Sequence, residues 1–201
     1  QAVQNCVAIG REALENGTGT GINGTVSVGY QSLTALTTGA GNIAIGYQAM
    51  LTNTTGAKNI AIGYGAMDDT DATAAADGGA GGSAGTLASS DNLFIGWGSG
   101  GGTWAGSDSN KNVAVGNNTL AGAMDGAEYN VALGHDAGKS ITTATGNIVI
   151  GYDCGDELTT GGENVLIGYG AGHSLVEGNN NVAIGYLTLD GGDEDSGCVA
   201  I

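Results

Sequence analysis

The sequence predicts an all-β repeat protein, a parallel β-solenoid with about 17 residues in each coil. Three observations lead to this fold class. A short pattern, Asn–aliphatic–small–aliphatic–Gly, recurs along the chain, and the spacing of its glycines settles at 17. The chain also contains no Pro, whose missing N–H would interrupt a ladder of strands that are paired on both sides. A fixed period of this length is typical of repeat architectures.

The closing glycines of the pattern define the coils. They stand at Gly10, Gly29, Gly46, Gly63, Gly96, Gly116, Gly134, Gly151, Gly168 and Gly185, with successive spacings of 19, 17, 17, 33, 20, 18, 17, 17 and 17. The gap of 33 is close to two periods, which indicates a degenerate coil or a looped-out insertion. We therefore expect one continuous repeat domain, with coils over 1–67 and 92–201 and an irregular insert at 68–91. The last four residues, 198–201, repeat 6–9, so we expect the chain to be a fragment of a longer array.

Each pattern predicts a short strand. Its two aliphatic residues are two positions apart, so in an extended strand they point to the same side. They are nearly all β-branched, which suits a pleated surface. The residue between them is most often Ala, so both faces of the strand are apolar or small, and we expect neither face to be fully solvated. A second short strand is expected after the glycine, followed by a Thr/Gly-rich turn.

The residues at the two ends of the pattern predict corners. Asn adopts turn conformations and can bond the backbone, and stacked Asn side chains can form an amide ladder. The closing Gly suits a positive φ or a close backbone approach. The structural repeat residues are Asn42, Gly46, Asn59, Gly63, Asn92, Gly96, Asn112, Gly116, Asn130, Gly134, Asn147, Gly151, Asn164, Gly168, Asn181 and Gly185.

Composition excludes several functions. The net charge is −16, with only four Lys and Arg, so nucleic acid is not an expected partner. No apolar stretch approaches the length of a membrane span. No catalytic arrangement is recognisable, so we do not expect an enzyme, and no cofactor is expected.

Two copies of the repeat carry a resemblance to known proteins. Asn-Ile-Ala-Ile-Gly-Tyr-Gln-Ala-Met (42–50) and Asn-Ile-Ala-Ile-Gly-Tyr-Gly-Ala-Met (59–67) resemble the head repeats of trimeric autotransporter adhesins. They are still more similar to the longer repeats of bacteriophage tail fibres, because adhesin repeats are typically shorter than the period of this chain. The resemblance implies a left-handed parallel β-roll in which three chains pack side by side. It also implies an attachment role on a virion or at a cell surface. The apolar character of both strand faces supports self-association independently.

Aromatic residues follow the repeat glycines and are the candidate receptor contacts. Stacked rings on the flank of a fibre could bind sugars, although stacking that only supports the coil is the favoured interpretation. The irregular stretches 68–91 and 97–111 are expected to break the ladder and to carry recognition loops. The candidate receptor contacts are Tyr47, Tyr64, Trp97 and Trp104.

Metal and thiol chemistry has weaker support. Acidic residues in the turns could hold Ca²⁺, and Asp190, Asp193, Glu194 and Asp195 are the best candidates, but solvated loops are the favoured interpretation. The three cysteines, Cys6, Cys154 and Cys198, are expected to be buried small residues and not a redox or metal centre.

The sequence therefore predicts a structural and attachment segment of a fibre, most consistent with a homotrimeric phage tail fibre that presents contacts to a host-surface receptor, such as a glycan. The predicted location is the virion or the cell surface. Two alternatives stay open: the head of a bacterial surface trimeric adhesin, and a subunit of a self-assembling extracellular filament. Thr pairs at 37/38, 54/55, 142/143 and 159/160 raise an ice-binding alternative, which is disfavoured because adjacent residues of a strand point to opposite sides.

Overall fold

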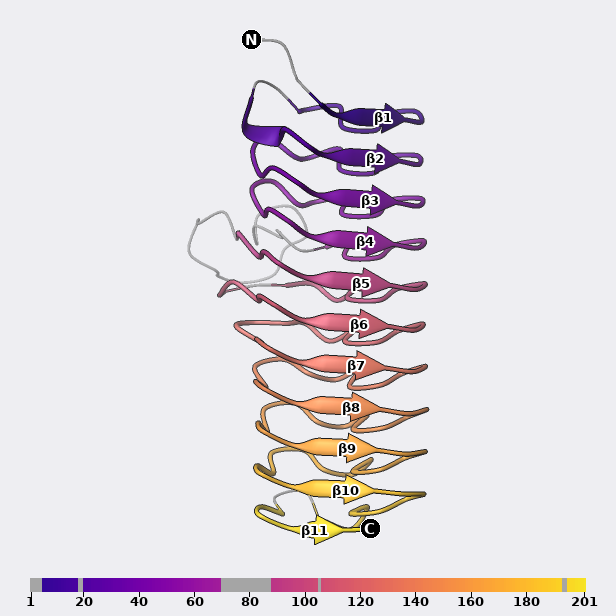
Figure 1. Cartoon of the computed structure of the whole chain (residues 1–201), viewed down its shortest axis with the longest axis vertical. Coiled ribbons are helices and arrows are strands. Elements are labelled where there is room, and N and C mark those ends of the chain that lie inside the picture. The colour runs from indigo at the N-terminus through magenta and orange to yellow at the C-terminus, as the bar shows by residue number, and fades with distance from the viewer. Residues whose placement is uncertain (1–4, 18–19, 70–87, 105, 193–194) are drawn as a thin grey trace.

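A computed structural model describes residues 5–17, 20–69, 88–104, 106–192 and 195–201. Eleven short strands stack in chain order into a single parallel sheet that runs along the long axis, with one strand to each coil (Figure 1). The predicted β-solenoid with about 17 residues per turn is thereby confirmed. The strands are β1 (Val7–Ile9), β2 (Val26–Val28), β3 (Ile43–Ile45), β4 (Ile60–Ile62), β5 (Leu93–Ile95), β6 (Val113–Val115), β7 (Val131–Leu133), β8 (Ile148–Ile150), β9 (Val165–Ile167), β10 (Val182–Ile184) and β11 (Val199–Ala200).

Each coil has one strand and not the two that we expected. The segment after the repeat glycine alternates the sign of φ, as at Gln48 (φ 55°) and Met50 (φ 52°), and so is not extended. This segment still bonds to its neighbours, because Gln48 N–H donates to the carbonyl of Tyr30 and Met50 N–H to that of Ala66. Bonds to the coils on both sides hold non-glycine residues in a left-handed conformation that they rarely adopt alone.

The interior of the solenoid is a narrow apolar column. The middle residue of each strand points inward, and from β2 to β10 it is fully buried, as at Ala44, Phe94 and Leu166. The turn segments contribute Leu33, Met50 and other side chains to the same column. Among the described residues the only helical element is the 3₁₀ turn η1 (Thr20–Ile22), and none of the described helices is long and apolar enough to cross a membrane.

An amide ladder runs along one corner of the column. The Oδ1 atom of Asn147 accepts the backbone N–H of Asn164 at 2.9 Å, and its Nδ2 donates to the carbonyl of Gly161 at 2.9 Å. The same arrangement continues from coil to coil, and these side chains are buried. The Asn side chains thus satisfy backbone groups that the corner would otherwise bury without partners.

The repeat glycines occupy the opposite end of each strand, where coils approach most closely. Gly151 has a φ of 143°, and a Cβ there would overlap the carbonyl oxygen of Gly168 in the next coil. Both the conformation and the contact therefore require glycine.

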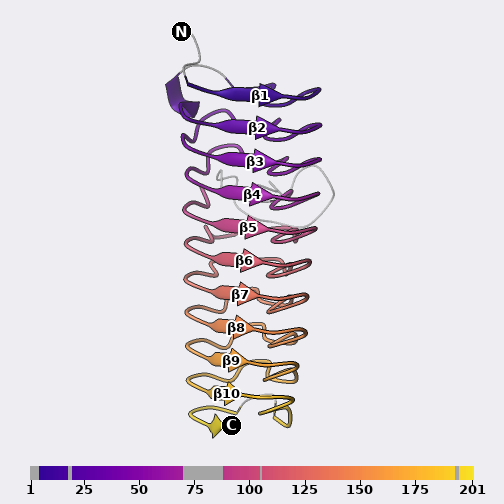
Figure 2. The same ribbon diagram turned by 45° about the vertical axis from the view of Figure 1, so that its right-hand side comes forward.

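The sheet is continuous across the irregular part of the chain. Strand β4 pairs directly with β5, Ile60 opposite Leu93 and Ile62 opposite Ile95, and β5 pairs with β6 in the same register. The expectation that 68–91 and 97–111 break the ladder is wrong, because β4, β5 and β6 stack in an unbroken series (Figure 2). Most of the first stretch, residues 70–87, lies outside the described residues.

Candidate functional site

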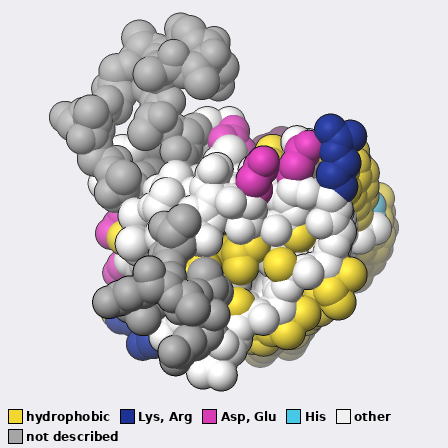
Figure 3. Space-filling view, turned by 90° about the horizontal axis from the view of Figure 1, so that it is seen from above, with side chains coloured by type: hydrophobic (Ala, Val, Ile, Leu, Met, Phe, Trp, Pro, Cys, Tyr) yellow, Lys and Arg dark blue, Asp and Glu magenta, His cyan; other side chains and the backbone are white. Residues whose placement is uncertain are grey.

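The outward face of the sheet is a continuous aliphatic surface. The two aliphatic residues of each strand flank the buried middle residue and point out of the solenoid, where they are partly or largely exposed. Ile45 and Ile148, for example, are 38% and 39% exposed. Viewed along the long axis, hydrophobic side chains occupy much of the rim on one side of the column (Figure 3). We call this surface, made by the first and third residues of β1 to β10, the aliphatic face.

Aromatic rings continue from the aliphatic face around the next corner. They stand directly after the repeat glycines. In two runs of coils, from Tyr30 to Tyr64 and from His135 to Tyr186, each ring stacks with that of the next coil. Centroid distances include 4.7 Å for Tyr47 and Tyr64, 5.2 Å for Tyr152 and Tyr169, and 5.4 Å for His135 and Tyr152. The rings therefore support one another, and their outer faces and edges stay exposed.

The two candidate tryptophans have different environments. Trp97 occupies the ring position of its coil and is 55% exposed, as expected of a surface contact. Trp104 is fully buried: it packs edge-on against Phe94 at 5.6 Å, and its Nε1 donates to the carbonyl of Gly100. Its assignment as a receptor contact is wrong, because the ring is buried inside the column, in a coil that is longer than the usual period.

A pocket of about 240 Å³ opens between the aromatic rings of two coils. We call it the Asp68 pocket. It is lined by Tyr64, Gly65, Asp68, Trp97, Gly98, Gly101, Asn118 and Ala121. Burial disfavours the charged form of the Asp68 carboxyl and, with the nearby Asp69 charge adding to it, raises its pKa to about 6. Its Oδ1 atom is buried and has no hydrogen-bond partner among the described residues.

Comparison of the chain with models of known protein families, with curated proteins and with solved structures found no match. The function is therefore inferred from the geometry of these surfaces.

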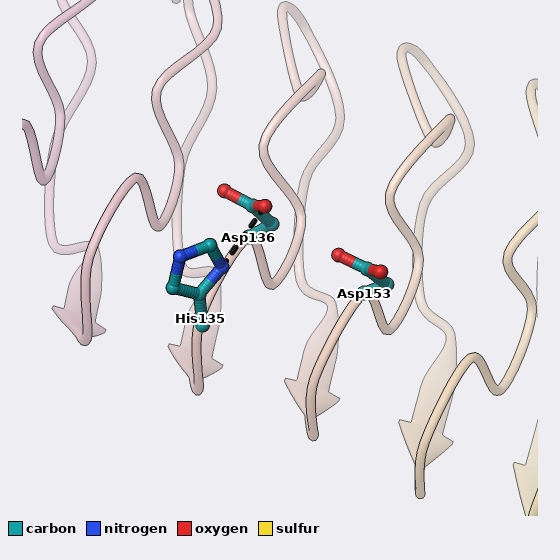
Figure 4. A group of neighbouring side chains, drawn as sticks. All are labelled: His135, Asp136 and Asp153. Carbon is teal, nitrogen blue, oxygen red and sulfur yellow. Dashed lines mark ion pairs between the residues drawn. The ribbon is translucent and has the colours of Figure 1, made fainter.

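A second group of polar side chains could ligate a metal ion. His135, Asp136 and Asp153 come from two successive coils, and their nearest donor atoms lie within 4.8 Å of one another (Figure 4). His135 Nδ1 is already 2.9 Å from Asp136 Oδ2, so the imidazole and that carboxylate pair in the absence of metal. Sequence reasoning missed this group because it compared neighbours along the chain. Aligning the coils would have placed Asp136 and Asp153 in one column.

The acidic residues that we considered for Ca²⁺ do not form such a group where the structure describes them. Asp190 accepts a hydrogen bond from Ser174 Oγ at 3.0 Å and lies 3.8 Å from His173. Asp195 uses its backbone carbonyl to accept from Asn181 Nδ2. Asp193 and Glu194 lie outside the described residues.

Charged side chains at the fifth position after the repeat glycine form a column of their own. Lys139 Nζ lies 2.8 Å from Asp156 Oδ2 of the next coil, and His173 Nε2 lies 3.5 Å from the same oxygen. The hydrogen bond to Asp156 raises the pKa of Lys139. In this column a carboxylate thus receives an ammonium group from the coil before it.

Cys154 occupies the core. Its thiol lies within hydrogen-bond distance of the carbonyls of Leu166 and Ala171, and burial raises its pKa to about 12. A thiol that stays protonated is a poor nucleophile and metal ligand.

Proposed function

We propose that this chain is a structural segment of a homotrimeric fibre, most consistent with a phage tail fibre, in which the aliphatic faces of three copies pack together. The observation that carries the proposal is the aliphatic face itself. A solvent-exposed sheet face normally carries polar residues, whereas here Val, Ile or Leu stands at both outward positions from β1 to β10. A contiguous apolar surface of this kind marks a protein–protein interface.

The repeat gives this surface the length that a fibre needs. At about 4.8 Å per coil, the eleven strands extend it over about 50 Å. Copies related by an axis parallel to the solenoid would bring the same residues together at every level, which is how symmetric oligomers use one surface many times. The segment would then act as a stiff rod on a virion or cell surface, with its exposed rings facing a host receptor such as a glycan.

The test is the molar mass in solution, measured by light scattering after size-exclusion chromatography. We expect three times the 19.5 kDa chain mass. The variant Ile45→Lys/Ile148→Lys/Ile184→Lys places three charges on the aliphatic face and should give monomers. The matched control Thr38→Lys/Thr143→Lys/Thr160→Lys adds the same charge on exposed turn positions and should stay trimeric. A monomeric wild-type protein, or equal dissociation of both variants, would overturn the proposal.

A further inference from the structure

The Asp68 pocket results from missing side chains. At the second position after the repeat glycine, other coils carry Gln48, Asn118 or Asp136, whereas the coils of β4 and β5 carry Gly65 and Gly98. At the fifth position after the repeat glycine, Gly101 lies beside Asp68. Because two adjacent coils lack side chains at matching positions, a hollow forms between the rings of Tyr64 and Trp97.

Three acceptor oxygens surround one point in this hollow. A Cβ built on Gly101 would lie 3.1 Å from the carbonyl oxygen of Gly98, 3.3 Å from that of Gly65 and 3.4 Å from the Asp68 carboxylate, Oδ1. The Gly98 oxygen already accepts a hydrogen bond from the N–H of Gly101, and its second lone pair can accept another from a ligand. This point is one bond length from Gly101 Cα, so a ligand atom would lie further out in the hollow, on the side of the three oxygens. A group that donates several hydrogen bonds and accepts none suits such a set of acceptors, which describes a primary ammonium; a hydroxyl donates only one.

Another coil of the chain has a carboxylate at the repeat position of Asp68, and that carboxylate binds an ammonium group. Asp156 occupies the same repeat position as Asp68 and is paired with the Lys139 ammonium from the preceding coil. In the coil that precedes Asp68, the position that corresponds to Lys139 is occupied by Leu51, which has no charge. No ion pair among the described residues involves Asp68, so the neutralising cation is not supplied from within that part of the chain.

The walls of the pocket fit a cation on a compact ring. Tyr64 and Trp97 are more than half exposed, and aromatic faces attract an adjacent ammonium. The volume of about 240 Å³ is below the range of about 300–1,000 Å³ for drug-sized ligands, so it suits a single ring.

We propose that the Asp68 pocket binds the primary ammonium group of a small ring-sized ligand, such as an amino sugar, with the nitrogen facing the Asp68 carboxylate and the carbonyl oxygens of Gly65 and Gly98. This site uses a corner of the coil and not the aliphatic face, so it does not depend on the trimer proposed above.

Calorimetric titration at pH 7 tests the proposal with two ligands of the same shape. Cyclohexylammonium should bind at least tenfold more tightly than cyclohexanol, which replaces the ammonium by a hydroxyl. Glucosamine should bind and glucose should not, which would show that the preference for an ammonium group also holds when the ring is a sugar. Equal affinity for the charged and uncharged member of each pair would overturn the proposal.

Variants then locate the binding. Asp68→Asn keeps the shape and removes the charge, and Gly101→Ala fills the point among the three oxygens with a methyl group. The next coil carries Ala121 at that position, so the second change suits the fold. Each should reduce cyclohexylammonium affinity tenfold or more. Asp153→Asn removes one charge elsewhere on the surface and should leave it unchanged.

Two results would contradict the assignment even if cyclohexylammonium binds. An equal loss in Asp153→Asn would mean that the negative surface attracts any cation. Displacement of the ligand by Ca²⁺ at micromolar concentration in the wild type, but not in Asp68→Asn, would mean that the pocket is a metal site. Thermal unfolding of each variant, with a transition as cooperative as that of the wild type, shows that the fold is retained.

Discussion

Glycine has two different uses at the corners of this solenoid. The repeat glycine, for example Gly151, has a backbone conformation open to few other residues and also abuts the next coil. Gly146, just before the Asn corner, has a φ of 74°, and a Cβ there would make only ordinary van der Waals contacts with Glu163. Other coils place Lys58, Tyr129 or Glu163 at this position at φ values of 57–60°. A side chain is thus excluded at the first position and permitted at the second.

This difference predicts unequal effects of one substitution. Gly151→Ala should lower the free energy of unfolding by about 3 kcal/mol or more, because positive φ strain and backbone overlap add together. Gly146→Ala should lower it by about 1 kcal/mol, the usual cost of a left-handed residue. Chemical denaturation of both variants measures this, and similar losses would show that the contact with Gly168 does not matter.

Asp68 predicts a pH dependence of stability. Its pKa in the folded protein is about 6, above the ordinary value of 3.8, so the fold favours the protonated form. The contribution of Asp68 to stability is therefore greatest below pH 4, falls as the pH rises from 4 to 6, and stays constant above that range. Asp68→Asn should remove this component and be more stable at pH 7 by about 1 kcal/mol, allowing for screening of a partly exposed group.

The measurement is the difference in unfolding free energy between wild type and Asp68→Asn at pH 4, 5 and 7, which cancels the titration of the other carboxylates. A difference that does not change with pH would show that Asp68 titrates normally.

Within a coil, the sizes of the inward-pointing side chains of the strand and of the turn segment compensate for each other. Where the middle strand residue is small, the turn in most coils supplies a large side chain, as with Ala114 and Leu120. Ala132 with Gly138 is an exception, and there the side chains of Leu120 and Ile141 lie next to the glycine. Where the middle strand residue is large, as with Leu166, the turn supplies Gly172, and a Cβ there would lie 2.9 Å from the Leu166 side chain. The width of the column therefore stays constant although individual residues differ.

The exchange predicts rescue by a double substitution. Leu166→Ala should cost about 2–5 kcal/mol through a cavity, and Gly172→Leu about 1–3 kcal/mol through overpacking. Leu166→Ala/Gly172→Leu recreates the pair found at Ala114 and Leu120, where Leu120 also has a positive φ. The double variant should be more stable than either single variant in thermal unfolding, and additive losses would contradict direct packing between the two positions.

The elements show which parts of the structure are predictable from sequence. Strand positions and the Asn corner follow from a local pattern that is repeated at each coil. The conformation of the turn does not, because residues such as Leu33 and Met50 have no intrinsic preference for positive φ and adopt it through bonds to neighbouring coils. The burial of Trp104 does not follow from a local pattern either, because it packs on Phe94, whose ring has room only because residue 100 is glycine.

The Asp68 pocket was harder to predict than the strands, because it forms where glycines replace the side chains of other coils. Gly65 and Gly98 are far apart in the sequence, and only the pairing of β4 with β5 makes them neighbours. The closeness of Asp68 and Gly101 could not be predicted for the same reason, since they belong to different coils. Identifying Tyr64 and Trp97 as candidate contacts required only their position after a repeat glycine.

At the scale of the whole molecule, the constant register makes the coil a unit of length. Deletion of 147–163 removes one period and brings Asn164 into the place of Asn147, so β7 would pair with β9 in the existing register. We expect a cooperative fold of slightly lower stability, since stability in repeat proteins is close to a sum of units and interfaces. Deletion of Val149 alone instead shortens β8 by one residue, so Ile150 would take the inward position and Gly151 the outward one. Circular dichroism and thermal unfolding distinguish the two, and equal stability would contradict a fixed register.

The direction of the hydrogen bonds has a mechanical consequence. Bonds between strands run from coil to coil, parallel to the long axis, so a pull along the rod loads the interfaces of one chain in series. In such an arrangement the weakest interface determines the force at which the chain opens, however many coils are added. Three chains joined side by side would share the load in parallel, and a coil that opened in one of them would be held in place by the other two.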